Sequence, residues 1–208
     1  MMGAPLLMNP NGNATTTEAM LRIARRRLPE LTGWTAPGGP PLITDMGLLA
    51  AAGAAVAAAT IAPDCPGVIV SAFGDPGAEA LRARLAVPVV GIGQTAAEVA
   101  SVEGRSFAVA THTPGLTPGI DLLMRRHGGA AYRGCWLAEG DPAGFDDPAV
   151  LDAAMLDAVE RAWGAGAEAV IIGGGPLGEV ALRIAPDAPC PLIQPIPEAA
   201  ARLRSLLG

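Results

Sequence analysis

The sequence has 208 residues, of which 50% are hydrophobic and only 3% aromatic, and it carries a formal net charge of −6 at pH 7. A chain of this length folds as one domain or as two small lobes, and its core must consist mainly of aliphatic side chains. Because nucleic-acid binding depends on a cationic surface, the acidic balance excludes that class of partner.

Short apolar runs alternate with amphipathic stretches along the whole chain, which is the pattern of strands followed by helices. The runs predicted to be strands are Pro5–Met8, Gly67–Ser71, Val87–Ile92, Phe107–Ala110, Ala169–Ile172 and Pro191–Ile193. The stretches predicted to be helices are Thr17–Leu28, Leu48–Ile61, Glu79–Leu85, Thr95–Val102, Ala149–Trp163 and Glu179–Ile184. Two stretches rich in glycine and proline or aspartate, Gly33–Pro41 and Gly140–Pro148, are predicted to be irregular loops. The alternation predicts an α/β fold with parallel sheets flanked by helices.

A weak internal repeat indicates two related lobes. Val68–Gly77 leads from a strand through a turn into a helix, and Val170–Gly178 does the same about 100 residues later. We therefore predict two pseudosymmetric lobes, the first made of residues 1–98 and 186–208 and the second of residues 99–185. In such sheets ligands bind beyond the carboxyl ends of the strands, so we expect an active-site cleft between the lobes.

The cysteines give no sign of a metal site or of disulfides. Cys65, Cys135 and Cys190 have no metal-binding spacing and fit reduced thiols in the cytoplasm. The start of the chain lacks the features of a signal peptide. The apolar run Gly47–Ala62 is Ala-rich and short, which favours a buried helix over a membrane span. No dinucleotide or Walker fingerprint is present. We expect a cytoplasmic protein without cofactor, metal or membrane contact.

Three turns carry the residues best suited to bind a ligand. The turn Asn9–Asn13 offers the amide of Asn11 to a carboxylate or carbonyl, although a helix N-cap is an equally good interpretation. The turns Ser71–Gly77 and Gly173–Pro176 link a strand to a helix and expose backbone amides that can hold an anion. The substrate-binding residues predicted from these turns are Asn11, Ser71, Ala72, Phe73, Gly174, Gly175 and Pro176.

The order of these turns resembles the hydantoin and aspartate/glutamate racemases. The resemblance rests on NPN at Asn9–Asn11 with Thr17, on FGDPG at Phe73–Gly77, on PVVGI at Pro88–Ile92, on T-x-T-P at Thr111–Pro114 and on GGGP at Gly173–Pro176. It extends over nearly the whole chain. It implies two pseudosymmetric α/β lobes, an active site between them, a small-molecule substrate and a homo-oligomer.

The chain departs from that family at the two positions that carry the chemistry. Family racemases place one cysteine in each lobe, and the two thiols remove and supply the proton on opposite faces of the substrate. The matching positions here are Ala72 and Gly174, and neither side chain can carry a proton. The resemblance therefore implies an atypical active site.

His112 is the remaining candidate for acid–base catalysis. It lies in the turn Thr111–Pro114, directly after a predicted strand, and histidine transfers protons near neutral pH. The alternative is an exposed loop histidine. Thr111 and Thr113 can donate hydrogen bonds to a substrate carbonyl or simply stabilise the turn. Asp75 is expected to cap the helix that follows it, and His127 to lie at a helix end.

Two functions remain open. The first is an isomerase- or lyase-type enzyme that acts on a small, amino-acid-derived carbonyl or carboxylate compound without a cofactor and without the two-cysteine pair. The second is a non-catalytic small-molecule binder, or a partner protein, on the same fold, because function depends on the site and not on the fold.

Overall fold

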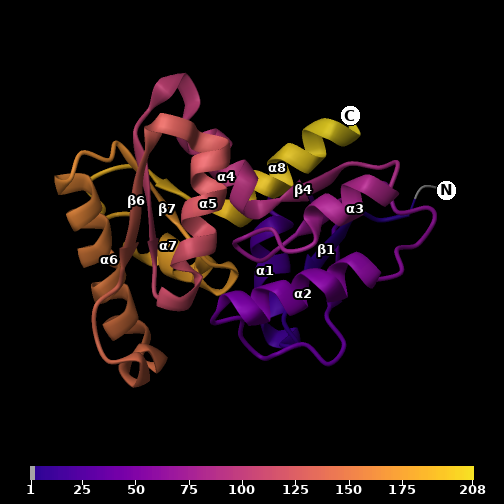
Figure 1. Ribbon diagram of the computed structural model, residues 1–208, viewed down its shortest axis with the longest axis horizontal. Helices are drawn as coiled ribbons and strands as arrows, with labels where there is room; N and C mark the ends of the chain where they lie inside the picture. The colour runs from indigo at the N-terminus through magenta and orange to yellow at the C-terminus, as the bar shows by residue number, and fades with distance from the viewer. Residues whose placement is uncertain (1–2) are drawn as a thin grey trace.

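The chain forms two four-stranded sheets with the same strand order (Figure 1). The structure is a computed structural model that describes residues 3–208, with residues 142, 143 and 176 described by their backbone alone. The first sheet has the order β2 (Thr32–Thr35), β1 (Leu6–Asn9), β3 (Val68–Val70) and β4 (Val89–Gly91). The second has the order β6 (Tyr132–Leu137), β5 (Phe107–Thr111), β7 (Ala169–Ile172) and β8 (Leu192–Ile193). All of these pairings are parallel, which confirms the predicted fold of two pseudosymmetric α/β lobes.

The inner strands are apolar because helices cover both faces of each sheet. Every residue of β3, β5 and β7 is buried. The helices are α1 (Ala14–Ala24), α2 (Met46–Ala58), α3 (Ala78–Arg84), α4 (Ile92–Ala100), α5 (Thr117–Gly128), α6 (Pro148–Gly164), α7 (Gly178–Ile184) and α8 (Pro195–Leu207). Short 3₁₀ turns lie at Val102–Gly104 (η1), Pro114–Leu116 (η2), Gly129–Ala131 (η3), Pro142–Asp146 (η4) and Gly175–Leu177 (η5).

Polar N-cap side chains set where three of the helices begin. The side chains of Asn13, Asp45 and Asp147 accept backbone N–H groups in the first turns of α1, α2 and α6. Such caps satisfy N–H groups that have no partner inside the helix.

The internal repeat corresponds to equivalent parts of the two sheets. Val68–Gly77 supplies β3 and the turn to α3, and Val170–Gly178 supplies β7 and the turn to α7. In each sheet the repeated strand lies between the first strand of its lobe and the last. The division into residue ranges is more complex than predicted, because residues 186–208 divide between the sheets: β8 pairs with β7, whereas α8 contacts β3 and β4.

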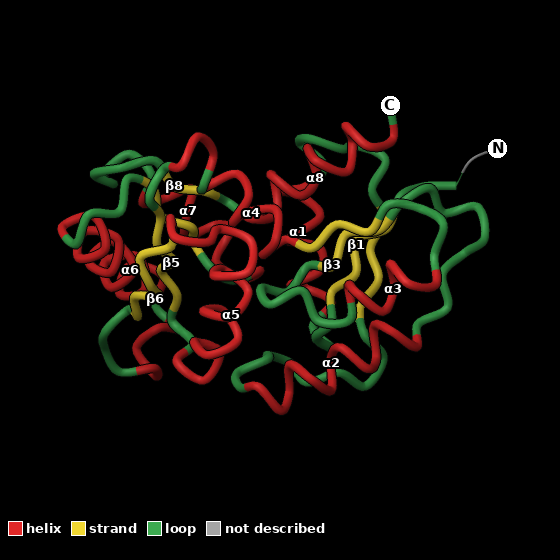
Figure 2. The backbone as a smooth tube through the Cα atoms, turned by 45° about the horizontal axis from the view of Figure 1, so that its top comes forward, coloured by secondary structure: helices red, strands yellow, loops and turns green. Residues whose placement is uncertain are grey.

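The two lobes share part of their core. One buried cluster includes Leu7 and Ile69 of the first sheet together with Val109 and Ile171 of the second. Helix α4 lies between the sheets and contacts α5 and β7 as well as α8 (Figure 2). Among the described residues, no helix has both the length and the apolar character needed to cross a bilayer.

Two strands lie where no strand was predicted. The expectation of an irregular loop over Gly33–Pro41 is wrong at its start, because β2 pairs with β1 there. Both β2 and β6 are edge strands, and their sequences contain glycine and polar residues that a buried strand would lack. A Cβ atom at Gly33 in β2 would lie 2.7 Å from Cδ1 of Leu21, so a larger residue there would require the Leu21 side chain to shift.

Candidate active site

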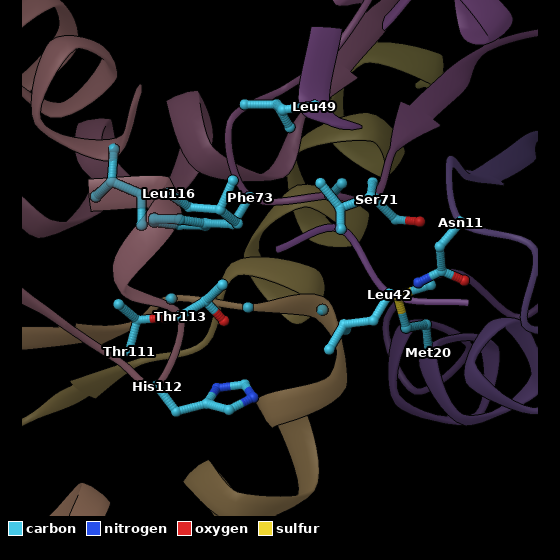
Figure 3. Close-up of a pocket in the computed structure, with 16 residues that line it drawn as sticks. Asn11, Met20, Leu42, Leu49, Ser71, Phe73, Thr111, His112, Thr113 and Leu116 are labelled. Carbon is cyan, nitrogen blue, oxygen red and sulfur yellow. The ribbon is translucent and has the colours of Figure 1, made fainter. Parts of the chain in front are cut away.

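A small pocket lies between the lobes, where the carboxyl ends of four inner strands meet (Figure 3). Asn11 follows β1, Ser71–Phe73 follow β3, Thr111–Thr113 stand at the end of β5, and Gly173–Gly175 follow β7. The other lining residues are Met20, Leu42, Ile43, Leu49, Leu116 and Ile120. The cavity volume is about 50 Å³, which is room for a few water molecules. The structure thus brings together residues that the sequence placed in four separate turns. The side chain of Pro176 lies outside the described part of the structure.

Asn11 presents an amide nitrogen to the pocket. Its Oδ1 atom accepts hydrogen bonds from Nδ2 of Asn9 at 2.8 Å and from the backbone N–H of Asn13 at 3.0 Å. Asn9 is itself held, since its Nδ2 also donates to Oγ1 of Thr17 at 2.9 Å. With its oxygen committed to the turn, Asn11 points its Nδ2 toward the side of the pocket that carries Leu42 (Figure 3). The amide is therefore a fixed donor for a ligand oxygen.

Each lobe also offers a pair of backbone N–H groups. The amides of Ala72 and Phe73 lie in the turn after β3, and those of Gly174 and Gly175 in the turn after β7. Within the described part of the chain these four N–H groups have no hydrogen-bond acceptor. Backbone donors at strand-to-helix turns suit an anion or a carbonyl oxygen that gains charge in a reaction.

Ala72 and Gly174, which the sequence resemblance aligns with the family cysteines, line this pocket from opposite lobes. The backbone of Gly174 is extended, with φ 161°, so it is a conformation that any residue can adopt. A Cβ atom there would lie 3.2 Å from the side chain of Leu177, which is a tight contact with the end of a flexible side chain. Gly173 is different, because its Cβ would lie 2.6 Å from Cγ1 of Val109.

His112 is the titratable side chain of the pocket. Its imidazole extends from the end of β5 beside Thr113 (Figure 3), and its ring meets that of Phe145 edge-on with centroids 6.2 Å apart. Its Nδ1 atom is buried and has no hydrogen-bond partner among the described residues. Burial lowers the pKa of His112 below its ordinary value of 6.5. The imidazole is therefore neutral at pH 7 and able to accept a proton.

The hydroxyl groups of the pocket differ in how freely they can bind a ligand. Ser71 donates its hydroxyl to the carbonyl of Met8 at 2.8 Å, so this side chain ties β3 to β1. Thr111 is buried at the end of β5, and Thr113 directly precedes η2. Figure 3 shows the hydroxyl of Thr113 on the same side as the His112 ring. Thr113 is the better placed of these donors for a ligand held near His112.

Sequence reasoning missed the apolar wall of the pocket. Leu42 and Ile43 come from the loop that precedes α2, Leu49 from α2, and Met20 and Ile120 from two other helices. These side chains come from helices and a loop that carry no sequence signal for a site. Their effect is to enclose the polar groups in apolar surroundings, where hydrogen bonds to a ligand are stronger.

Asp75 caps a different helix from the one expected. Its carboxylate accepts the backbone N–H groups of Gly93 and Gln94, both at 2.7 Å, at the start of α4 and not of α3. The turn from β3 folds back so that the carboxylate reaches over the end of β4. His127 lies in the last turn of α5, as expected, and does not line the pocket.

The described residues that line the pocket include no Asp, Glu, Lys or Arg side chain and none of the three cysteines. With His112 neutral, they carry no formal charge at pH 7. Among the described residues, no three His, Cys, Asp or Glu side chains come together as the ligands of a metal ion would.

Comparisons with known proteins agree with this geometry. A sequence model of the family described as Asp/Glu/Hydantoin racemase matches residues 6–203. A hydantoin racemase from Rhizobium meliloti is 30% identical over 145 residues, which cover 67% of this chain and 59% of the relative. The chain thus aligns with less than two thirds of that relative's length.

Solved structures show the same fold. An allantoin racemase from Pseudomonas fluorescens superimposes with a TM-score of 0.88 at 25% identity, covering 98% of this chain and 90% of the other. An allantoin racemase from Klebsiella pneumoniae gives a TM-score of 0.86 at 21% identity, covering 99% and 87%.

Proposed function

Because this chain belongs to the Asp/Glu/hydantoin racemase family, we propose that it is a cofactor-independent enzyme that moves a proton on a small amino-acid-derived carbonyl compound. The observation that carries this proposal is the buried, unpartnered Nδ1 atom of His112 in a pocket without a thiol. A buried polar atom without a partner is uncommon in a native protein and is explained here by a partner that the substrate supplies.

The neutral pocket favours an uncharged ring over a free amino acid. An ionised ammonium or carboxylate group would be buried without an opposite charge, which is costly. A cyclic amide such as a hydantoin needs only hydrogen-bond partners, and Asn11, Thr113 and the turn amides supply donors. Hydantoin and allantoin, the compounds named for the similar racemases, are rings of this kind.

In the proposed reaction, neutral His112 accepts the proton from the ring carbon that lies next to a carbonyl group. The electron pair of the C–H bond moves toward that carbonyl, and the oxygen that becomes negative is held by backbone N–H groups of the turns. The imidazolium then returns a proton to the same carbon. Ala72 and Gly174 cannot deliver a proton to the opposite face of the ring carbon. The α-proton therefore exchanges with retention of configuration. A substrate whose carbanion loses a leaving group would undergo elimination instead.

Entry of such a ring requires movement, since a cavity of about 50 Å³ is smaller than the ligand. The loop that carries Leu42 and Ile43 is the part of the wall best able to move, because it lies outside the sheets and helices. We infer that this loop opens to admit the substrate.

The deciding experiment follows α-proton exchange in deuterium oxide by NMR. The compounds are hydantoin, 5-methylhydantoin, allantoin and alanine, and circular dichroism of the chiral compounds reports their configuration. We expect exchange of the cyclic amides with retention, and its loss in H112Q. Exchange with inversion would contradict a single-base mechanism.

A non-catalytic binder is the second candidate, favoured by the absence of any proton-carrying side chain at Ala72 and Gly174. Saturable binding of a hydantoin without exchange, in both the original protein and H112Q, would support it.

A further inference from the structure

The turn that supplies the Ala72 and Phe73 amides also contains Asp75, and the two are directly connected. The backbone N–H of Asp75 donates to the carbonyl of Ala72 at 3.0 Å. Asp75 has a positive φ of 50° and Gly74 has a φ of 124°, so the turn uses left-handed backbone next to the pocket. Asp75 is therefore tied by its backbone to Ala72, which lines the pocket.

The side chain of Asp75 attaches this turn to α4, the helix between the two sheets. Both of its oxygens accept backbone N–H groups at 2.7 Å, one from Gly93 and one from Gln94. A carboxylate at a helix N-terminus interacts favourably with the unpaired N–H groups and the helix dipole. The attachment thus depends on the negative charge of Asp75.

Two glycines lie against the carboxylate of Asp75. A Cβ atom at Gly91 would lie 2.3 Å from the carboxyl carbon of Asp75. A Cβ atom at Gly93 would lie 3.3 Å from its Oδ1 atom and 2.6 Å from Leu123 of α5. Gly91 and Gly93 thus make space for the Asp75 carboxylate, which connects the turn after β3 in the first lobe to α4, a helix that also contacts the second lobe.

We propose that Asp75 is a positioning residue of the pocket, whose ionised carboxylate holds the Ala72 and Phe73 amides in place by attaching their turn to the start of α4. Protonation of Asp75 removes one acceptor and weakens the other, so the turn loosens and the two amides lose their fixed direction. The effect on catalysis rests on the proposed function, whereas the effect on the free protein does not.

The charge of Asp75 is set by burial and by its neighbours. Desolvation by burial raises the pKa of Asp75 from 3.8 to about 6, against the lowering effect of the two backbone hydrogen bonds and of Arg82. The charged groups that face this region are Glu79 and Arg82 from α3, Glu98 from α4, and Arg126 and His127 from α5. Helix α2, which packs on the same turn, has no charged residue.

The test is a pH titration of the free protein by amide NMR, between about pH 4.5 and about pH 8.5, bracketing the pKa of a shifted carboxyl group. It uses H112Q/H127Q, in which neither histidine can titrate. We expect the amide signals of Gly93, Gln94, Ala72 and Phe73 to shift together with a midpoint near the raised pKa of Asp75, which is about 6. In the same background with D75N added, all four signals should stay constant. Asparagine suits a positive φ as well as aspartate does, so D75N removes the charge without adding backbone strain.

Two results would overturn the proposal. If Gly93 and Gln94 titrate while Ala72 and Phe73 do not, Asp75 is a helix cap without a role in the pocket. If none of the four titrates near pH 6, the carboxylate does not control the turn. Should D75N fail to fold, the titration of H112Q/H127Q alone still decides between these results.

Activity gives a second readout with a matched control. At pH 8 we expect D75N to lower kcat for proton exchange on 5-methylhydantoin by about 10-fold, because misaligned donors bind the developing oxyanion less well. E79Q, which removes a carboxylate four residues away on α3, should keep the kcat of the original protein. If the original protein shows no exchange, the proposed function fails, and the NMR titration still tests Asp75.

Discussion

Gly91 leaves the space that the carboxylate of Asp75 occupies, since a methyl group at residue 91 would lie 2.3 Å from the carboxyl carbon. The two positions are 16 residues apart in the chain, with Gly91 at the end of β4 and Asp75 in the turn after β3. The dependence of one position on the other can be measured as the coupling energy between substitutions at Gly91 and Asp75.

We predict that G91A destabilises the protein by about 1–3 kcal/mol, the usual cost of overpacking. In a D75A background the cost of G91A should fall, because the carboxylate that the methyl group meets is absent. Urea unfolding of both single variants and the double variant gives the coupling. Additive effects would show that the methyl group is accommodated elsewhere.

Asp75 should reduce stability at neutral pH while it supports the site. Its pKa is raised in the folded protein, so the folded state holds the proton more tightly than the unfolded state between pH 3.8 and about pH 6. The free energy of unfolding therefore falls as the pH rises through this range. The shift corresponds to at most about 3 kcal/mol at 1.36 kcal/mol per pH unit, and the partial exposure of the residue reduces this value.

Consequently D75N should match or exceed the original protein in unfolding free energy at pH 8, and this gain should shrink toward pH 4. Chemical denaturation at several pH values measures the difference. A large loss of stability in D75N at pH 8 would mean that the two 2.7 Å hydrogen bonds outweigh the cost of burying the charge.

H112Q should lower the rate of α-proton exchange by about 10²–10⁴-fold, the usual contribution of a general base. Because the pKa of His112 lies below 6.5, activity of the original protein should be constant above that pH and fall below it as the imidazole becomes protonated. A plot of kcat/KM against pH, which reports the ionisation of the free enzyme, measures this decrease at low pH. H112N serves as a second neutral variant, and exchange that survives in both would exclude His112 as the base.

The double variant A72C/G174C should gain the ability to invert configuration. Both positions line the pocket from opposite lobes, and the tight contact at Gly174 is with the flexible side chain of Leu177. We expect the double variant to racemize 5-methylhydantoin, and circular dichroism measures the loss of optical activity. A72S/G174S is the matched control, since a hydroxyl without an adjacent base is a poor proton carrier at neutral pH. Equal racemization by the serine variant would show that the thiols are not responsible.

N11D should weaken ligand binding more than it weakens the fold. The substitution keeps the oxygen that accepts from Asn9 and Asn13, but replaces the Nδ2 donor on the pocket side with an acceptor. Loss of a buried hydrogen bond costs about 1–3 kcal/mol, so we expect a roughly 10- to 100-fold higher Kd for hydantoin by calorimetry. N11A, which also removes the accepting oxygen, should lose more thermal stability than N11D. If N11D loses more thermal stability than N11A, the main role of Asn11 is to stabilise the turn and not to bind the ligand.

The sequence predicts the inner strands well and the edges poorly. β3, β5 and β7 are continuous apolar runs because helices cover both of their faces, and such runs are visible in any sequence. β2 and β6 are half exposed at sheet edges, and their glycines and polar residues do not form a strand pattern.

The convergence of the site could also be predicted, because parallel strands end at one edge of a sheet. Asn11, Ser71, Thr111 and Gly174 all lie at or just beyond the ends of inner strands and meet in one pocket. The capping of α4 by Asp75 could not be predicted, since it depends on how far a turn folds back across β4. The sequence around Asp75 does not indicate how far the turn folds back, because that depends on the packing of β4 and α4.

The lack of a cysteine in the described lining of the pocket also changes what can inactivate the protein. A catalytic thiolate is lost to oxidation or alkylation because it is a strong nucleophile. Here Cys65, Cys135 and Cys190 lie outside the pocket, and burial raises the pKa of the Cys135 thiol to about 12 and that of Cys190 above its ordinary value. We therefore expect the proposed pocket chemistry to persist under peroxide and iodoacetamide, conditions that inactivate enzymes dependent on a reactive cysteine.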